Sequence, residues 1–89
     1  MTRILLADDH PMIRTAIEVL LRDTRFEIAG TASNGEEALR EVARIEPDIL
    51  LLDLQMPEAT GMDVLRRLRA EDSKLPVILL TAAIDDAAL

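Results

Sequence analysis

The sequence predicts an α/β protein built on a parallel sheet, and three observations support this prediction. Four short apolar runs, at residues 4–7, 28–32, 49–52 and 77–80, are spaced along the chain. The runs are continuous rather than alternating, which is typical of strands that are covered on both faces of a parallel sheet. Amphipathic stretches with helical spacing separate them. Strands that alternate with helices form βαβ units with right-handed crossovers, so the expected order is β-α-β-α-β-α-β.

Length and composition limit what the chain can be. The chain has 89 residues, the size of one small domain. The absence of cysteine excludes a disulfide scaffold, a thiolate metal site and a cysteine nucleophile, and it suits a reducing cytoplasm. A net charge of −7 argues against direct non-specific binding of nucleic acid. We recognise no signal peptide, and no apolar run approaches the ~18 residues of a membrane span.

The first two helices are predicted from apolar spacing and from their ends. Pro11 suits the first turn of the first helix, because that turn tolerates proline. The apolar stripe of this helix consists of Ile13, Ala16, Ile17, Leu20 and Leu21. Ser33 and Asn34 are candidate caps for the second helix, with acids at capping-box spacing, and Pro47 closes it. Its predicted buried stripe consists of Ala38, Leu39, Val42 and Ala43.

The third helix is predicted over residues 63–71, after a loop at 55–61. Its apolar side consists of Val64, Leu65 and Leu68. A fourth helix is expected to start at residues 84–87. No internal repeat, linker or low-complexity segment interrupts this pattern, so residues 1–89 are treated as one domain.

Acidic and hydroxyl side chains follow three of the four predicted strands. Asp8 and Asp9 follow the first run, Asp53 the third and Thr81 the fourth. Ligands of open parallel sheets bind at the carboxyl ends of the strands, where these residues are expected to meet. Neighbouring carboxylates repel one another or recruit a cation, and an all-oxygen set suits Mg²⁺. An aspartate beside Mg²⁺ can form an aspartyl phosphate. Asp48 begins the third strand and is expected to be structural, at the opposite edge.

Each of these residues also has a plainer interpretation. Asp8 and Asp9 suit the capping of the helix that begins near Pro11. Asp53 alone is equally well a solvated loop acid, and Thr81 alone is a turn or cap residue. His10, the only histidine, is expected to be merely solvated. The joint arrangement, rather than any single residue, favours a site.

Four motifs and one glycine resemble a known family. They are LADDHP at 6–11, NGEEAL at 34–39, PDILLLDLQMP at 47–57, PVILLTA at 76–82, and Gly61. In this order they resemble the receiver domain of bacterial two-component response regulators. The start of the chain and the ASNGEEA stretch at 32–38 look most like LuxR/NarL-type transcription regulators.

The resemblance implies a role for each matching residue. Asp8 and Asp9 match the acidic pair that holds Mg²⁺, and Asp53 matches the phosphoacceptor, which also contacts the metal. The backbone carbonyl of Gln55 would be a further metal ligand. Thr81 matches the hydroxyl that swings toward the phosphoryl group, and the small Ala82 leaves that group room.

The resemblance also implies a fold and a function. Family members have a flavodoxin-like (CheY-like) fold, which gives the strand order 2-1-3-4 for the strands present here. They accept a phosphoryl group from a sensor histidine kinase and, in this subfamily, act on a DNA-binding transcription effector. They are not enzymes beyond ancillary self-phosphorylation and dephosphorylation. One alternative, an Mg²⁺-dependent aspartyl-phosphate phosphatase, is disfavoured because Gln55 stands where such enzymes usually carry a second acid.

The chain also departs from the family pattern. Such receivers continue for two more helices and a fifth strand that ends in a lysine, whereas the one lysine here is Lys74, before the fourth strand. We therefore expect an incomplete receiver with impaired switching. Residues 77–80 would form a bare edge strand, and such edges pair with other chains. A homodimer or other self-association through this edge is expected, and the second alternative is a truncated interaction module that does not switch.

Overall fold

The computed structural model describes residues 1–57 and 60–80. Three predictions lie outside the described residues: the roles of Thr81 and Ala82, and the fourth helix at 84–87. The elements are β1 (Thr2–Ala7), α1 (Pro11–Leu21), β2 (Phe26–Ala32), α2 (Gly35–Ile45), β3 (Ile49–Asp53), α3 (Gly61–Ala70) and β4 (Val77–Leu80). The four strands are parallel and ordered β2-β1-β3-β4, so the predicted fold class and strand order are confirmed.

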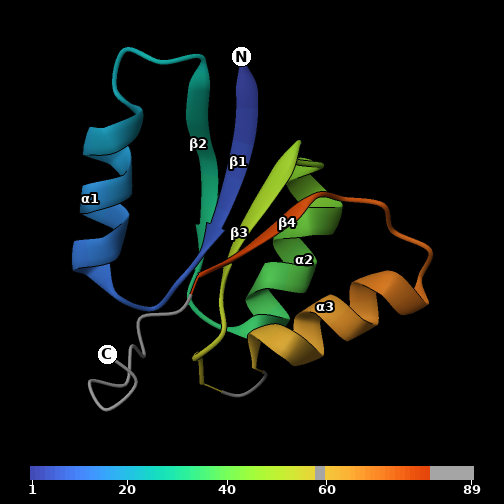
Figure 1. The fold of residues 1–89 in the computed structure, drawn as a ribbon. Helices are drawn as coiled ribbons and strands as arrows, with labels where there is room; N and C mark the ends of the chain where they lie inside the picture. The colour runs from blue at the N-terminus through green and yellow to red at the C-terminus, as the bar shows by residue number, and fades with distance from the viewer. Residues whose placement is uncertain (58–59, 81–89) are drawn as a thin grey trace, which may run out of the picture.

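The sheet separates two helical layers. Helix α1 lies on one side of the sheet, and α2 and α3 lie on the other (Figure 1). Successive side chains of a strand point to opposite faces. Leu5, Leu50 and Leu52 therefore pack toward α2 and α3, and Leu6 and Leu51 toward α1.

The helices α2 and α3 have well-formed amino ends. The side chain of Asn34 accepts a hydrogen bond from the Glu37 amide at 2.8 Å, which confirms Asn34 as the cap of α2. Helix α3 begins at Gly61, two residues before the prediction, because Thr60 and Asp63 form a reciprocal capping box. In α2, Ala38 is fully buried, but the predicted core residue Ala43 is exposed.

Helix α1 is held differently. It has no side-chain cap and no buried residue, and Leu20 of its predicted apolar stripe is 71% exposed. The residue at the N-cap position is His10, so neither Asp8 nor Asp9 caps this helix.

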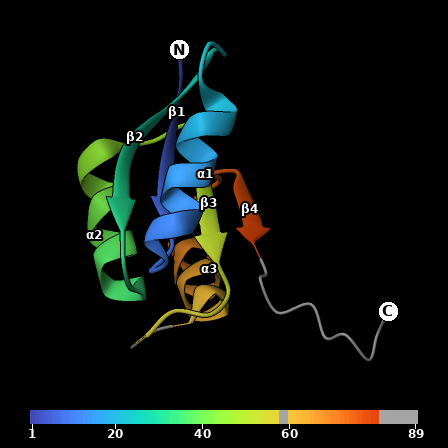
Figure 2. The ribbon, with the colours of Figure 1, turned by 90° about the vertical axis from the view of Figure 1, so that its left-hand side faces the viewer.

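Strand β4 lies at the edge of the described sheet and is partly open. It pairs only with β3, and Ile78 and Leu79 are 51% and 40% exposed. Figure 2, turned so that α1 lies in front, shows no strand beyond β4 in the described part of the chain. The expected exposed edge at residues 77–80 is therefore present. In residues 1–57 and 60–80, no helix combines the length and the apolar character needed to cross a membrane.

Candidate functional site

The carboxyl ends of β1 and β3 place two aspartates side by side. Ala7 is the register partner of Leu52, so the residues that follow them, Asp8 and Asp53, emerge together. Both are almost completely buried, at 3% and 2% exposure. Buried carboxylates are rare unless they are paired with or bound to a partner. Asp9, with a side chain that is 33% exposed, lies on the solvent side of the pair.

A histidine joins these carboxylates. Ligand atoms of Asp8, Asp9, His10 and Asp53, here called the site cluster, all lie within 4.8 Å of one another. The imidazole Nδ1 of His10 is 2.8 Å from Asp8 Oδ1, 3.2 Å from Asp9 Oδ1 and 3.6 Å from Asp53 Oδ2. The hydrogen bond to Asp8, followed by the charge of Asp9, raises the pKa of His10. The expectation that His10 is merely solvated was therefore wrong, although its side chain remains 52% exposed.

The two oxygens of Asp53 have different environments. Oδ1 accepts a hydrogen bond from the Gln55 amide at 2.9 Å. Oδ2 is buried and has no hydrogen-bond partner among the described residues. A buried oxygen without a partner costs about 1–3 kcal/mol, and more when it is charged, so this atom is suited to an external electrophile or cation.

Arg14, which the sequence did not identify as a site residue, hydrogen-bonds to the backbone of Asp8. Arg14 Nε and Nη2 donate to the Asp8 carbonyl at 3.0 and 2.7 Å. Nη2 also donates to the Ala32 carbonyl at 3.2 Å and to Ser33 Oγ at 2.6 Å. These bonds tie α1 to the carboxyl ends of β1 and β2. Arg14 interrupts the apolar stripe of α1, and this position is the only sequence signal that could have identified it.

The start of α3 lies close against the end of β3. A Cβ atom at Gly61 would collide with the carbonyl oxygen of Asp53 and approach Leu54 Cα within 2.8 Å. The Gly61 amide donates to the Leu54 carbonyl at 3.3 Å, which seats the start of α3 on the end of β3. Only glycine allows this approach without displacing the backbone of Asp53.

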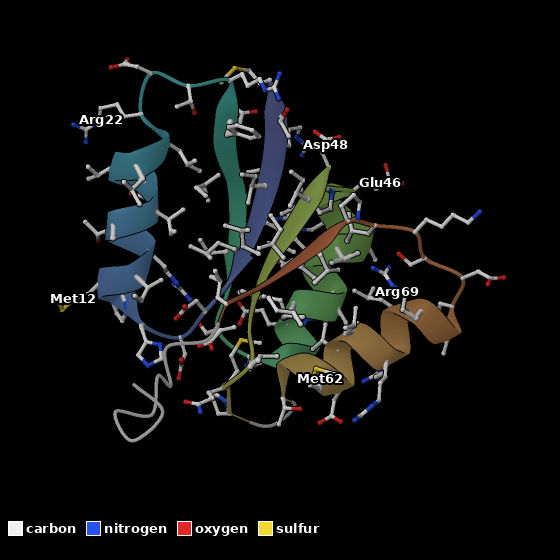
Figure 3. The ribbon with its side chains drawn as sticks, in the orientation of Figure 1. Met12, Arg22, Glu46, Asp48, Met62 and Arg69 are labelled. Atoms are coloured by element: carbon white, nitrogen blue, oxygen red, sulfur yellow. The ribbon has the colours of Figure 1, made fainter. Side chains whose placement is uncertain are left out.

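Two charged residues lie at the opposite, amino edge of the sheet. Asp48 Oδ2 accepts a hydrogen bond from the Arg3 amide at 2.8 Å, which confirms the structural role predicted for it. Figure 3 shows Asp48 at the start of β3, away from the carboxyl ends of the strands. Lys74 is exposed in the loop between α3 and β4, so it takes no part in the site cluster.

Comparisons with known proteins agree with this architecture. The response regulator receiver domain model matches residues 4–89. The chemotaxis protein CheY of Listeria monocytogenes is 37% identical over 82 residues, which cover 92% of this chain and 69% of CheY. The transcriptional regulatory protein YdfI of Bacillus subtilis is 36% identical over 87 residues, which cover 97% of this chain and 40% of YdfI.

Solved structures give the same result. A DNA-binding response regulator of the LuxR family from Staphylococcus aureus superimposes with a TM-score of 0.85 and 29% identity, over 99% of this chain and 74% of that one. The chain spans 24% to 69% of the length of the first curated relatives that it matches. The match over residues 4–89, together with the parallel sheet and its acidic edge, shows that this chain belongs to the response regulator receiver domain family.

Proposed function

We propose that Asp53 is the phosphoacceptor of this receiver domain. The observation that carries the proposal is Asp53 Oδ2, which is buried at the carboxyl end of β3 and has no hydrogen-bond partner among the described residues. The Gln55 amide holds the other oxygen, so the carboxylate presents one defined nucleophilic atom. Oδ2 forms a bond to phosphorus while the bond from phosphorus to the donor breaks. The donor, the imidazole of a phosphohistidine in a sensor histidine kinase, leaves with the bonding electrons and takes up a proton.

The donor set of the site fits Mg²⁺. Asp8, Asp9 and Asp53 supply carboxylate oxygens, and we assign the backbone carbonyl of Gln55 as a further ligand. Mg²⁺ favours a few carboxylates together with water and phosphate oxygens. When bound, this ion neutralises charge that develops on the transferred phosphoryl group. Arg14 keeps Asp8 in place through the Asp8 carbonyl, and Asp8 and Asp9 orient their oxygens toward Asp53.

We assign Thr81 as the hydroxyl that responds to phosphorylation. Leu80 is the register partner of Asp53, and the Leu54 amide donates to the Leu80 carbonyl at 3.0 Å. Thr81 therefore directly follows the residue paired with the acceptor. The Thr81 hydroxyl would donate to a phosphoryl oxygen, and Ala82 would leave space for it. In the cytoplasm, this change would be passed to a DNA-binding effector in the parent protein.

Labelling with acetyl phosphate in the presence of Mg²⁺ tests the assignment of Asp53. We expect the intact mass of the wild-type chain to increase by one phosphoryl group. Asp53→Asn should take up none, because an amide is a poor nucleophile. Asp48→Asn is the matched control, since it removes a carboxylate at the opposite edge of the sheet, and it should be labelled like the wild type.

Other outcomes would contradict this assignment. Equal labelling of Asp53→Asn and the wild type would place the acceptor elsewhere. Multiple turnovers of a small phosphomonoester would instead favour the phosphatase. Absence of any labelling in a folded chain would favour an interaction module that does not switch.

We also propose that a second copy of the chain pairs along β4. The proposal is supported by the half-exposed Ile78 and Leu79 at an edge that has one strand neighbour in the described sheet. Light scattering should find a dimer whose fraction rises with concentration. Ile78→Lys should shift the chain toward monomer, whereas Met12→Lys, on exposed α1, should not. A wild-type chain that stays monomeric at every concentration would refute this interface.

A further inference from the structure

His10 adds a nitrogen atom to a site that sequence reasoning treated as purely oxygen. Its Nδ1 faces Asp8, Asp9 and Asp53, with all three carboxylates within 3.6 Å. The backbone amide of His10 donates to Asp8 Oδ1 at 2.7 Å, so the main chain as well as the ring is fixed beside the carboxylates. The imidazole is therefore positioned as part of the site.

We propose that His10 Nδ1 is a metal ligand and makes the site cluster a binding site for divalent transition ions such as Ni²⁺, Co²⁺ and Zn²⁺. The inference rests on the metal site of the proposed function and adds a class of ion to it. The imidazole binds as the neutral tautomer, with its proton on Nε2, so that the Nδ1 lone pair faces the three carboxylates.

The spacing of the ligand atoms is close to what such an ion needs. With bonds of about 2.1 Å, two ligand atoms on opposite sides of an ion lie about 4.2 Å apart. The ligand atoms of the site cluster all lie within 4.8 Å of one another. A contraction of about half an ångström would complete the coordination. Asp9 and His10 are partly exposed and can supply this movement, whereas Asp8 and Asp53 are buried.

A second observation, independent of the acidic character of the site, also points to a ligand. Asp53 Oδ2 has no hydrogen-bond partner among the described residues, and the side chain of Asp53 is 3% exposed. The His10 ring nitrogen lies 3.6 Å from this oxygen, too far for a hydrogen bond. A cation between Asp53 and His10 would satisfy the oxygen and the ring nitrogen together.

Ligand chemistry determines which ions gain from His10. Mg²⁺ is a hard ion that prefers oxygen, so an imidazole adds little to its binding. Imidazole suits Ni²⁺, Cu²⁺ and Zn²⁺, and affinities of mixed nitrogen and oxygen sites rise from Mn²⁺ to Cu²⁺. Removal of His10 should therefore weaken the binding of transition ions and leave the binding of Mg²⁺ almost unchanged.

The sequence makes this inference unusually easy to test. The chain has one histidine and no cysteine, so in a tag-free protein no other imidazole or thiolate competes for a transition ion. We would titrate the full chain with NiCl₂ and MgCl₂ by calorimetry, in the wild type, His10→Ala and His10→Asn. Thermal unfolding of each variant establishes that the chain remains folded.

We expect both substitutions to weaken the affinity for Ni²⁺ by about tenfold or more, since even residues that only hydrogen-bond to a metal ligand contribute on that scale. The affinity for Mg²⁺ should change by less than about threefold, because this ion gains little from imidazole. Electron spin-echo spectra of Mn²⁺ bound to the wild type should show coupling to an imidazole nitrogen, and His10→Ala should abolish it.

Two outcomes would overturn the inference: an equal loss of affinity for Ni²⁺ and Mg²⁺ in His10→Ala, or an unchanged affinity for Ni²⁺. Failure of the proposed function has a different signature. In that case the wild type would not be labelled by acetyl phosphate in Mg²⁺, while the effect of His10 on Ni²⁺ would persist.

Discussion

The two faces of the sheet are packed by different means. On the α2 and α3 face, Val64 and Leu68 are 0% and 2% exposed, and they contact the buried side chains of β1 and β3. On the α1 face, no helical residue is buried, and Val19 and Leu20 are 52% and 71% exposed. Arg14 instead fastens α1 to the strand ends by hydrogen bonds.

This difference separates stability from the geometry of the site. Apolar burial on the α2 and α3 face supplies most of the hydrophobic stabilisation, because burial is roughly proportional to the area removed from water. The polar contacts of α1 are concentrated beside Asp8. We therefore expect changes on the first face to unfold the domain, and changes around Arg14 to disturb the site while the fold persists.

Leucine-to-alanine substitutions on the two faces should show the largest contrast. Leu68→Ala should lower the free energy of unfolding by about 2–5 kcal/mol, because it opens a cavity in a close-packed region. Leu20→Ala removes an equal number of atoms from the exposed part of α1 and should change it by less than about 0.5 kcal/mol. Urea unfolding followed by circular dichroism measures both. Equal losses would show that the two faces contribute alike.

The start of α3 lies close against the backbone at the end of β3. Gly61→Ala should lower the free energy of unfolding by about 1–3 kcal/mol, because the new methyl group meets the backbone of Asp53 and Leu54. Labelling of Asp53 should slow as well. Gly30→Ala is the comparison, since its methyl group meets side chains rather than backbone, and the close contact is with the end of the Ile45 side chain, which can move. A cost for Gly30→Ala equal to that for Gly61→Ala would mean that backbone crowding is not the cause.

Arg14→Met tests the polar attachment of α1. Loss of the hydrogen bonds to Asp8, Ala32 and Ser33 should lower the free energy of unfolding by about 1–2 kcal/mol and weaken the binding of Mg²⁺. Arg14→Lys should not restore the affinity, because an ammonium group lacks the planar fork of the guanidinium. Arg22→Met, at the far end of α1 and pointing away from the sheet in Figure 3, is the matched control. Unchanged Mg²⁺ affinity in Arg14→Met would refute a positioning role.

The smallest effect concerns the ends of the helices. Hydrogen bonds from Thr60 lower the pKa of Asp63, so its carboxylate stabilises the folded state. This contribution is complete above the unfolded pKa and is lost as the pH falls through the lower folded pKa. The stability difference between the wild type and Asp63→Asn should thus be constant near neutral pH and shrink in acid. Helix α1 has no acid in its first turn, so we expect no comparable pH-dependent contribution to stability from its amino end. A difference that grows in acid would contradict the assignment.

Strand and helix positions could be predicted because they depend on local patterns, whereas the strand order was implied by the family resemblance. The continuous apolar runs correctly identified β1 to β4, and the cap at Asn34 correctly marked the start of α2. The convergence of Asp8 and Asp53 followed from the topology alone, since parallel strands bring their carboxyl ends to one edge.

The remaining features depend on side-chain direction, which spacing does not determine. The helical stripe that placed Ala43 in the core was too wide by one position. Arg14 and His10 lie next to predicted residues in the sequence, but their roles depend on rotamers that turn them toward Asp8. Thr81 was predicted from its place after β4, and its assignment remains a prediction.

The position of Lys74 has a practical consequence. It is the only lysine, and it lies in the exposed loop that leads into the amino end of β4. Met1 directly precedes β1 and so lies at the same amino end of the strands. Reagents that couple primary amines to a sensor surface would thus attach the chain by one edge and present the opposite edge to solution. Immobilised protein should keep the site cluster, at the carboxyl ends of the strands, facing the solution. The ion titrations and kinase-binding measurements can then be made on one oriented layer.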